Sequence, residues 1–289
     1  MILVTGAMGT VGRATVAALQ ARNAVFKVGV RAPSDAKALG ADGVAFDWTD
    51  PRTFGPALMG VERLFVLTPV SELSTSWMVQ LTAAAHRAAV THVVRLSASG
   101  ADEEPGTIFG RMHLGAEKVV RSSGLAWTIL RPTLFMQNFL MRYGVDPRRD
   151  RQVALPHGTG KAAWIDAHDV GEVAATVLSS TGHAGKVYEL SGPEALTTAE
   201  CLGLLGRALR HHYEYLDVPE VDALKALEAR YPPWLADAYL ETHARVKRSL
   251  SAGVAWGVQT VLGRGARSFA EYARDVAAET GRPGRGDET

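Results

Sequence analysis

The stretch TGAMGTVGR, residues 5–13, combines residue types and a spacing that suggest chemistry. Its glycines, Gly6, Gly9 and Gly12, are three residues apart and follow the apolar run MILV. A strand that turns sharply into a helix exposes backbone N–H groups, and these groups favour an anion such as a phosphate. The stretch predicts either a dinucleotide site or an ordinary glycine-rich turn, and the amphipathic residues 11–22 that follow favour the dinucleotide.

By analogy with other dinucleotide folds, Gly6 would allow the tight turn, Gly9 the approach of a pyrophosphate, and Gly12 the close packing of helix on strand. Thr68-Pro69 ends a later strand, where the backbone is expected to run beside the adenosine and pyrophosphate. The predicted cofactor-binding residues of these loops and of the later strand ends are Thr5, Gly6, Met8, Gly9, Thr10, Val11, Gly12, Thr68, Pro69, Ser97, Ala98 and Pro132.

The end of the second predicted strand, VGVRAPSDA, bears on the choice of cofactor. A carboxylate at this point accepts from the ribose 2′-hydroxyl of NAD, whereas an arginine favours the 2′-phosphate of NADP. Arg31 stands there and no acid occurs over 25–34, so NADP(H) is predicted, the alternative being an ordinary exposed arginine. Asp47 ends the third strand and is expected either to accept from the adenine amino group or to cap a turn.

Apolar strands alternate with amphipathic helices in the first half of the chain. This alternation predicts an α/β fold, a doubly wound parallel sheet with helices on both faces. Strands are expected at 2–4, 25–30, 43–47, 63–67, 92–96 and 127–130, with helices between them. We expect a nucleotide-binding domain over 1–135, a smaller mixed substrate lobe over 136–280 and a flexible tail over 281–289. Later strands near 163–166 and 186–191 are candidates to return to the main sheet.

Composition narrows the class of protein. The net charge of +1 gives no general reason to expect nucleic acid or an acidic membrane, and the single cysteine, Cys201, excludes an internal disulfide. No signal peptide, membrane span or metal-ligand spacing is visible, so we expect a cytoplasmic protein without a metal. The expected partner is a small aromatic molecule, and the chain is expected to be a monomer or homodimer.

Several stretches together resemble the NmrA-like branch of the atypical short-chain dehydrogenases, which includes NADPH-dependent quinone reductases. They are VTGAMGTVGR, VRAPSDA, RLSASGAD, GRMHLGAEKVVRSSGLAWTILRPTLFMQN, WIDAHDVGEVAATVL and KVYELSGPEALT, and the match spans about residues 1–275. The resemblance implies a Rossmann fold, NADP(H) binding and a cleft between two lobes. It leaves open quinone and azo-type reductases, biosynthetic reductases and regulators that bind the nucleotide without turnover.

The chain departs from ordinary short-chain dehydrogenases at the catalytic pair, because no Y-x-x-x-K occurs between the fifth and sixth strands. His113 could protonate a reduced oxygen or simply pair with Glu117, four residues along the same helix face. Lys118 is expected to reach the nicotinamide ribose or to stay in solvent. Ser97 and Ser99, just past the fifth strand, could hold a carbonyl or the nicotinamide amide. Ser97, His113 and Lys118 are the predicted catalytic residues.

A quinone accepts hydride readily because its product is aromatic, so a site without the Tyr–Lys pair suits it. The predicted substrate contacts are Ser99, Phe135, Asn138, Phe139 and Trp164, with one of the two phenylalanines expected in the core. We therefore expect an NADPH-dependent oxidoreductase that transfers hydride to a quinone or a related conjugated aromatic carbonyl compound. The alternatives are a nucleotide-sensing regulator and a tailoring reductase or isomerase of aromatic natural products.

Overall fold

The computed structural model describes residues 1–281 and divides the chain into two compact units. The first unit contains residues 1–132, 167–190 and 256–265, and the second contains 133–166, 191–255 and the chain from 266 onward. After residue 135 the chain returns twice to the first unit, at 167–190 and 256–265, and the first of these returns contains the strand 186–191 that was a candidate to do so. Of the predicted tail 281–289, only Gly281 is described, after the last helix, and 282–289 lie outside the described residues.

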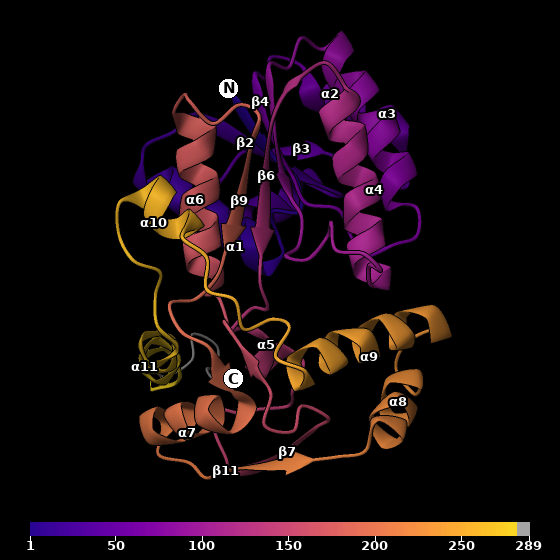
Figure 1. The fold of residues 1–289 in the computed structure, drawn as a ribbon. Helices are drawn as coiled ribbons and strands as arrows, with labels where there is room; N and C mark the ends of the chain where they lie inside the picture. Colours follow the sequence, from indigo (N-terminus) through magenta and orange to yellow (C-terminus); the bar gives the residue numbers. More distant parts are fainter. Residues whose placement is uncertain (282–289) are drawn as a thin grey trace. The chain divides into compact units, whose positions relative to one another are not determined.

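A seven-stranded, all-parallel sheet forms the centre of the first unit, in the order β3-β2-β1-β4-β5-β6-β9 (Figure 1). Its strands are β1 (Ile2–Val4), β2 (Phe26–Val30), β3 (Gly43–Ala45), β4 (Arg63–Val66), β5 (His92–Leu96), β6 (Ala126–Pro132) and β9 (Lys186–Leu190). The strand order reverses between β1 and β4, and in such sheets ligands bind at the carboxyl ends of the strands beside the reversal. The predicted doubly wound sheet is confirmed.

Helices cover both faces of this sheet, with α2, α3 and α4 on one side and α1, α6 and α10 on the other (Figure 1). They are α1 (Thr10–Ala21), α2 (Phe54–Leu58), α3 (Ser74–Arg87), α4 (Ile108–Ser122), α6 (Ala167–Ser179) and α10 (Gly257–Leu262), with short 3-10 helices at Pro33–Leu39 and Pro51–Thr53. On the side of α2 and α3, the ring of Phe46 stacks on Phe54 and meets Trp48 edge to face. These three rings belong to a hydrophobic core that also contains Leu3 and Met78. Such burial of apolar surface is what holds the helices to the sheet.

The second unit is mixed, with short strands and five helices among its described residues. The strands are β7 (Arg151–Leu155), β8 (Lys161–Ala162), β10 (Leu196–Thr197) and β11 (Tyr213–Asp217), and the helices are α5 (Asn138–Met141), α7 (Thr198–Leu209), α8 (Glu220–Glu228), α9 (Pro233–Lys247) and α11 (Phe269–Thr280). β7 pairs in parallel with β11, and β8 pairs with β10.

Of the two later strands expected to return to the main sheet, one does so. The predicted strand 186–191 is β9, which pairs with β6. The segment 163–166 does not join that sheet, because the chain there pairs within the second unit, where Ile165 bridges Phe135. No helix within residues 1–281 has the length and apolar character needed to cross a membrane.

Candidate active site

The glycine-rich loop connects β1 to α1 at the point where the strand order reverses. Gly6 has a left-handed φ of +62°, and a Cβ there would lie 2.8 Å from the Leu67 Cβ. A Cβ on Gly12 would lie 2.1 Å from the Gly6 carbonyl oxygen. Gly9 is exposed, and a Cβ there would meet only that same oxygen, at 3.4 Å. Two of the glycines are therefore required by packing, and the third leaves backbone open at the surface.

The amino end of α1 is suited to an anion. Gly9 is the N-cap, no side chain caps the helix, and no acidic residue occupies its first turn. Backbone N–H groups at such an end, together with the helix dipole, attract phosphate. The loop and helix start therefore fit the pyrophosphate of a dinucleotide, and the glycines leave the room that it needs.

Two residues predicted in this loop use their side chains elsewhere. The Thr5 hydroxyl is buried, donates to the Phe65 carbonyl at 3.1 Å and accepts from the Leu67 N–H at 3.0 Å. Val11 is buried as part of the core. Only the backbones of these two residues are therefore available to a ligand, whereas Met8 is exposed. Thr68-Pro69 follows Leu67, which lies against the glycine loop, and the contact of this dipeptide with the adenosine and pyrophosphate stays a prediction.

Arg31 is exposed at the end of β2. Asp47 accepts from the backbone N–H of Thr49 at 2.9 Å and from its hydroxyl at 2.8 Å, so it stabilises a local turn, one of the two predicted roles. These hydrogen bonds hold the pKa of Asp47 below its ordinary value, with a smaller contribution from the charge of Arg31. The guanidinium of Arg31 thus lies close enough to Asp47 to influence it, and the adenine contact of Asp47 stays a prediction.

The loop after β5 stays attached to β6. The Ser97 N–H donates to the Leu130 carbonyl at 2.7 Å, and the Ser99 N–H donates to the Pro132 carbonyl at 2.9 Å. The predicted residues Ser97, Ala98, Ser99 and Pro132 are therefore neighbours at the carboxyl edge of the sheet. Ser97 is buried, whereas Ser99 is exposed.

Arg131, near the end of β6, is the centre of a charged network at this edge. Its guanidinium donates to Glu117 through Nε at 2.9 Å and through Nη2 at 2.8 Å. Glu117 is fully buried on α4 and also accepts from the Ser97 hydroxyl at 2.6 Å. Burial alone would raise the pKa of Glu117, but the hydrogen bonds from Arg131 and Ser97 outweigh it and hold the pKa below its ordinary value.

The same arginine also holds two partly exposed carboxylates. Its Nη1 donates to Asp102 at 2.6 Å and to Glu189 at 3.1 Å, and the two carboxylate side chains are 59% and 41% exposed. The hydrogen bond from Arg131 lowers the pKa of Asp102, whereas burial raises the pKa of Glu189 above its ordinary value. Ser99 shares a side-chain hydrogen bond with Glu189.

The structure argues against two of the three predicted catalytic residues. His113 Nδ1 is buried and has no hydrogen-bond partner among the described residues, and burial, followed by the charge of Arg95, lowers the pKa of His113 to about 3. An imidazole that is neutral at physiological pH is a poor proton donor. His113 Nδ1 also makes no hydrogen bond to Glu117, so the predicted pairing of these two residues through that atom does not occur. Lys118 is exposed on α4, about 100° around the helix from the buried Glu117, which supports the solvated alternative.

Two predicted substrate contacts belong to the core of the second unit. Phe139 is 0% exposed and Trp164 is 1% exposed, and their rings meet edge to face at 5.1 Å. The Trp164 Nε1–H is also occupied by the Leu196 carbonyl. These two residues therefore offer no free surface, which makes Phe139 the core member of the phenylalanine pair. Phe135 and Asn138 are half-buried and stay predicted substrate contacts.

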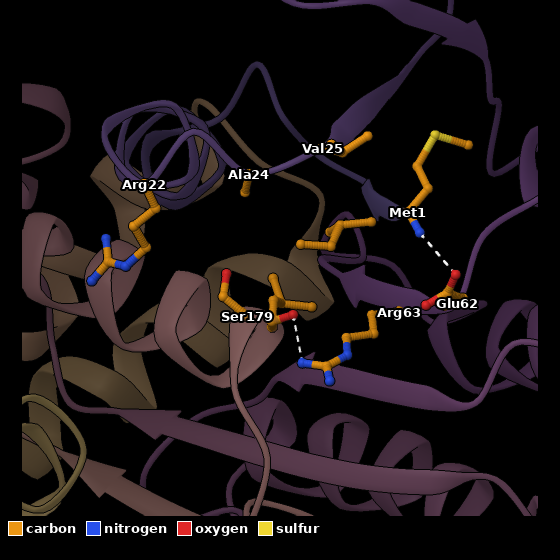
Figure 2. Close-up of a pocket in the computed structure, with 9 residues that line it drawn as sticks. Met1, Arg22, Ala24, Val25, Glu62, Arg63 and Ser179 are labelled. Carbon is orange, nitrogen blue, oxygen red and sulfur yellow. Dashed lines mark hydrogen bonds and ion pairs between the residues drawn. The ribbon is translucent and has the colours of Figure 1, made fainter.

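A pocket of ≈ 340 Å³ opens at the other edge of the sheet, where the strands begin (Figure 2). Ile2, Val25, Arg63 and Leu178 are among its lining residues. Arg63 donates to the carbonyls of Leu178 and Ser180, at 2.8 and 2.7 Å, and so caps the carboxyl end of α6. This pocket is separated from the glycine loop by the length of the strands.

Sequence reasoning missed Asp102, Arg131 and Glu189 as members of the site. The available signal was a charged residue at the end of an apolar strand, in TILRP and KVYEL. Arg131 and Glu189 are register partners on β6 and β9, but 58 residues separate them in sequence. Their pairing depends on β9 returning to the sheet, which the sequence offered only as a candidate.

The parallel sheet, the glycine loop at its strand reversal and the uncapped start of α1 define a nucleotide-binding Rossmann unit. Residues 6–181 match the NAD(P)H-binding family, and the chain belongs to that family. An NAD(P)H azoreductase from Xenophilus azovorans is 38% identical, over 97% of this chain and 99% of its own length. A (4-alkanoyl-5-oxo-2,5-dihydrofuran-3-yl)methyl phosphate reductase from Streptomyces griseus is 36% identical, over 96% of this chain and 98% of its own.

Solved structures agree with these relatives. The NADPH complex of an NADPH-dependent quinone oxidoreductase from Escherichia coli superposes with a TM-score of 0.82 at 26% identity, over 96% of this chain and 99% of the other. NmrA, a negative transcriptional regulator, shares the fold with a TM-score of 0.76 at 16% identity, over 96% of both chains. The predicted resemblance is confirmed, and the chain is an NAD(P)H-dependent oxidoreductase.

Proposed function

We propose that this oxidoreductase uses NADPH to reduce a quinone, an azo compound or a related conjugated aromatic acceptor. The observation that carries the proposal is the carboxyl edge of the sheet, where an open glycine loop and a partly exposed carboxylate pair occur without a Tyr–Lys pair. Full-length similarity to an azoreductase and likeness to a quinone oxidoreductase support the same acceptor class.

The residues of the first unit have separate tasks in this proposal. The backbone at Gly9 and the start of α1 would hold the pyrophosphate, and Arg31 would pair with the 2′-phosphate. The loop from Ser97 to Ser99 would border the nicotinamide, because it follows the strand next to β4. When bound, NADPH supplies a hydride. Reduction of a quinone to a hydroquinone then needs one further proton.

The hydrogen bond from the buried Ser97 to Glu117 has a defined direction. Its single hydroxyl proton is donated to Glu117, so its oxygen is left as an acceptor. It would therefore receive an N–H, such as one from the nicotinamide amide, rather than donate to a carbonyl. Of the two ligands predicted for this serine, the amide is the one that this hydrogen bond favours.

The test is NADPH consumption by the purified protein against a panel of quinones, azo dyes and conjugated ketones, with NADH in parallel. Turnover of any of these acceptors with a preference for NADPH supports the proposal. Tight NADPH binding without turnover of any acceptor contradicts it and favours the nucleotide-sensing alternative.

A second candidate function is a biosynthetic reductase, and a specific observation favours it. The Streptomyces relative is named for reduction of a butenolide phosphate and covers nearly the whole chain. A conjugated butenolide phosphate in the same panel tests this candidate. Its turnover at a much higher kcat/KM than any quinone would favour the biosynthetic role.

A further inference from the structure

We propose that Glu189 is a catalytic residue that donates a proton to the acceptor once the hydride has been transferred. This inference rests on the proposed function and extends it to acceptors whose reduced form is strongly basic. Glu189 is the penultimate residue of β9, at the carboxyl edge of the sheet, and pairs with Arg131 on β6. Its side chain is 41% exposed, so an acceptor and solvent can both reach it.

Geometry separates Glu189 from the other carboxylates of the network. Glu117 is fully enclosed and accepts two hydrogen bonds from Arg131, so it has no route to a ligand. Asp102 takes the shorter hydrogen bond from Nη1 of Arg131, at 2.6 Å, and Glu189 the longer one, at 3.1 Å. Arg131 therefore stabilises the charge of Asp102 more strongly than that of Glu189.

The pKa values of the two partly exposed carboxylates are shifted in opposite directions. The pKa of Asp102 is lowered by the hydrogen bond from Arg131, whereas the pKa of Glu189 is raised by burial and by the neighbouring charge of Asp102. A pair of carboxylates pushed apart in this way supplies one ionised group and one proton donor. Of the two, Glu189 holds a proton more readily and is the one that we assign as the donor.

The surroundings of Glu189 contain few other charges. Arg131 faces it from β6, Ser99 and Asp102 face it from the chain after β5, and Glu117 lies behind Arg131 on α4. Helix α10 packs on β9, and its sequence GVQTVL has no charged residue. Glu189 is thus the group in this network whose proton can be both donated and replaced from solvent.

The chemistry decides which acceptors need this proton. An azo group that receives a hydride on one nitrogen carries a strongly basic charge on the other, and the proton of Glu189 completes the hydrazo product. The Glu189 carboxylate then recovers a proton from water, so NADPH, one proton and the azo compound give NADP⁺ and the hydrazo compound. A quinone gives a weakly basic phenolate, which water can protonate unaided. Glu189 should therefore matter for azo compounds and much less for quinones.

The experiment compares wild-type protein with the Glu189→Gln variant, using methyl red as the azo probe and menadione as the quinone probe. Glutamine keeps the hydrogen bonds to Arg131 and Ser99 but has no acidic proton. General acid catalysis contributes about 10²–10⁴-fold, so kcat/KM for methyl red should fall about 100-fold. The value for menadione should fall less than about threefold, because its product needs little acid assistance.

Two further readouts separate catalysis from a structural role. In wild-type protein, kcat/KM for methyl red should decline as the pH rises through the pKa of Glu189, and this decline should disappear in Glu189→Gln. Carbon-13 NMR of the cofactor-free protein should show a carboxyl signal, absent from Glu189→Gln, that titrates above the ordinary range for glutamate. Glu194→Gln, which alters an exposed glutamate five residues further along, is the matched control and should leave both acceptors unaffected.

The possible outcomes are distinguishable. Wild-type protein that reduces no acceptor of the panel of quinones, azo dyes and conjugated ketones refutes the proposed function and this inference together. Wild-type protein that reduces menadione but not methyl red refutes this inference and leaves the proposed function standing. Wild-type protein that reduces methyl red equally well after Glu189→Gln refutes only the role of Glu189. Equal losses on both acceptors, with weaker NADPH binding by fluorescence titration, would also refute it and assign Glu189 a structural role. A selective loss on methyl red with unchanged NADPH affinity supports it.

Discussion

Replacing Arg131 by methionine should destabilise the first unit strongly at neutral pH. The Arg131 side chain is 5% exposed and its main partner, Glu117, is 0% exposed, so the substitution leaves a carboxylate buried with fewer donors. Breaking a buried ion pair by removing one partner costs about 3–5 kcal/mol. The lost contacts to the partly exposed Asp102 and Glu189 add little, about 0–1 kcal/mol each. We expect a total loss of about 4 kcal/mol at pH 7.

The sign of the pH dependence makes this prediction sharper. In the wild type the folded-state pKa of Glu117 lies below its ordinary value of 4.5, so its stabilising contribution is present above pH 4.5 and is lost as the pH falls through the folded-state pKa. In Arg131→Met the burial of Glu117 dominates and raises that pKa. The variant therefore gains relative stability as the pH falls, and its deficit should shrink between pH 7 and pH 4.5.

The assay is urea unfolding at both pH values, followed by hydrogen exchange of β5 and β6 amides, which reports on the unit that contains Arg131. The double variant Glu117→Leu/Arg131→Met removes both charges and should be more stable at pH 7 than Arg131→Met alone. A single-variant loss below about 1 kcal/mol, or a deficit that grows on acidification, would refute the buried-pair reasoning.

Three further predictions concern the cofactor loop and the second unit. Arg31→Ala should weaken NADPH binding about 10- to 100-fold while leaving NADH binding nearly unchanged, measured by fluorescence titration, and equal losses would contradict a 2′-phosphate contact. Gly12→Ala should lower the melting temperature and abolish NADPH binding, because its Cβ would lie 2.1 Å from the Gly6 carbonyl oxygen. Gly9→Ala should fold normally, and equal melting temperatures of the two variants would contradict the packing argument. His157 and His243 share a 2.7 Å hydrogen bond, and burial lowers their pKa values to about 3 and about 4. Below pH 6.5 each histidine is protonated in the unfolded state but not in the folded one, so each lowers the free energy of unfolding by up to about 1.4 kcal/mol per pH unit. In urea unfolding between pH 6.5 and 5, His243→Gln should therefore reduce the dependence of this free energy on pH. An unchanged dependence would contradict the burial of a neutral His243.

Local patterns were enough to predict most of the first unit. Apolar strands such as Ile2–Val4 and His92–Leu96, separated by amphipathic helices, predict a parallel sheet because the helices between them cover both of its faces. The elements that could not be predicted were short strands in the second unit. Lys161–Ala162 has only two residues, and Tyr213–Asp217 reads YEYLD, whose two acidic residues weaken its apolar pattern. Both strands also pair with partners that are distant in sequence.

The candidate site was predictable only where its residues are contiguous. The glycine loop and Arg31 follow strands directly, so their place at the sheet edge follows from chain order. Trp164 was expected to line the pocket as an aromatic residue of the second lobe, yet it is 1% exposed because its ring packs edge to face on Phe139. Glu189 could not be assigned to the site because its partner, Arg131, lies on a strand that precedes it by 58 residues.

Arg131 also explains how stability and chemistry are linked in this chain. One side of its guanidinium compensates the buried Glu117, and the other side is shared between Asp102 and Glu189. Because the same group stabilises the sheet edge and donates unequally to the two outer carboxylates, at 2.6 and 3.1 Å, neither property can be changed alone at this residue. A lysine at 131 would keep the charge but not the forked geometry, so it would satisfy Glu117 or the outer pair, but not both. The proton-donating function is therefore best altered at Glu189 itself, where the fold has less to lose.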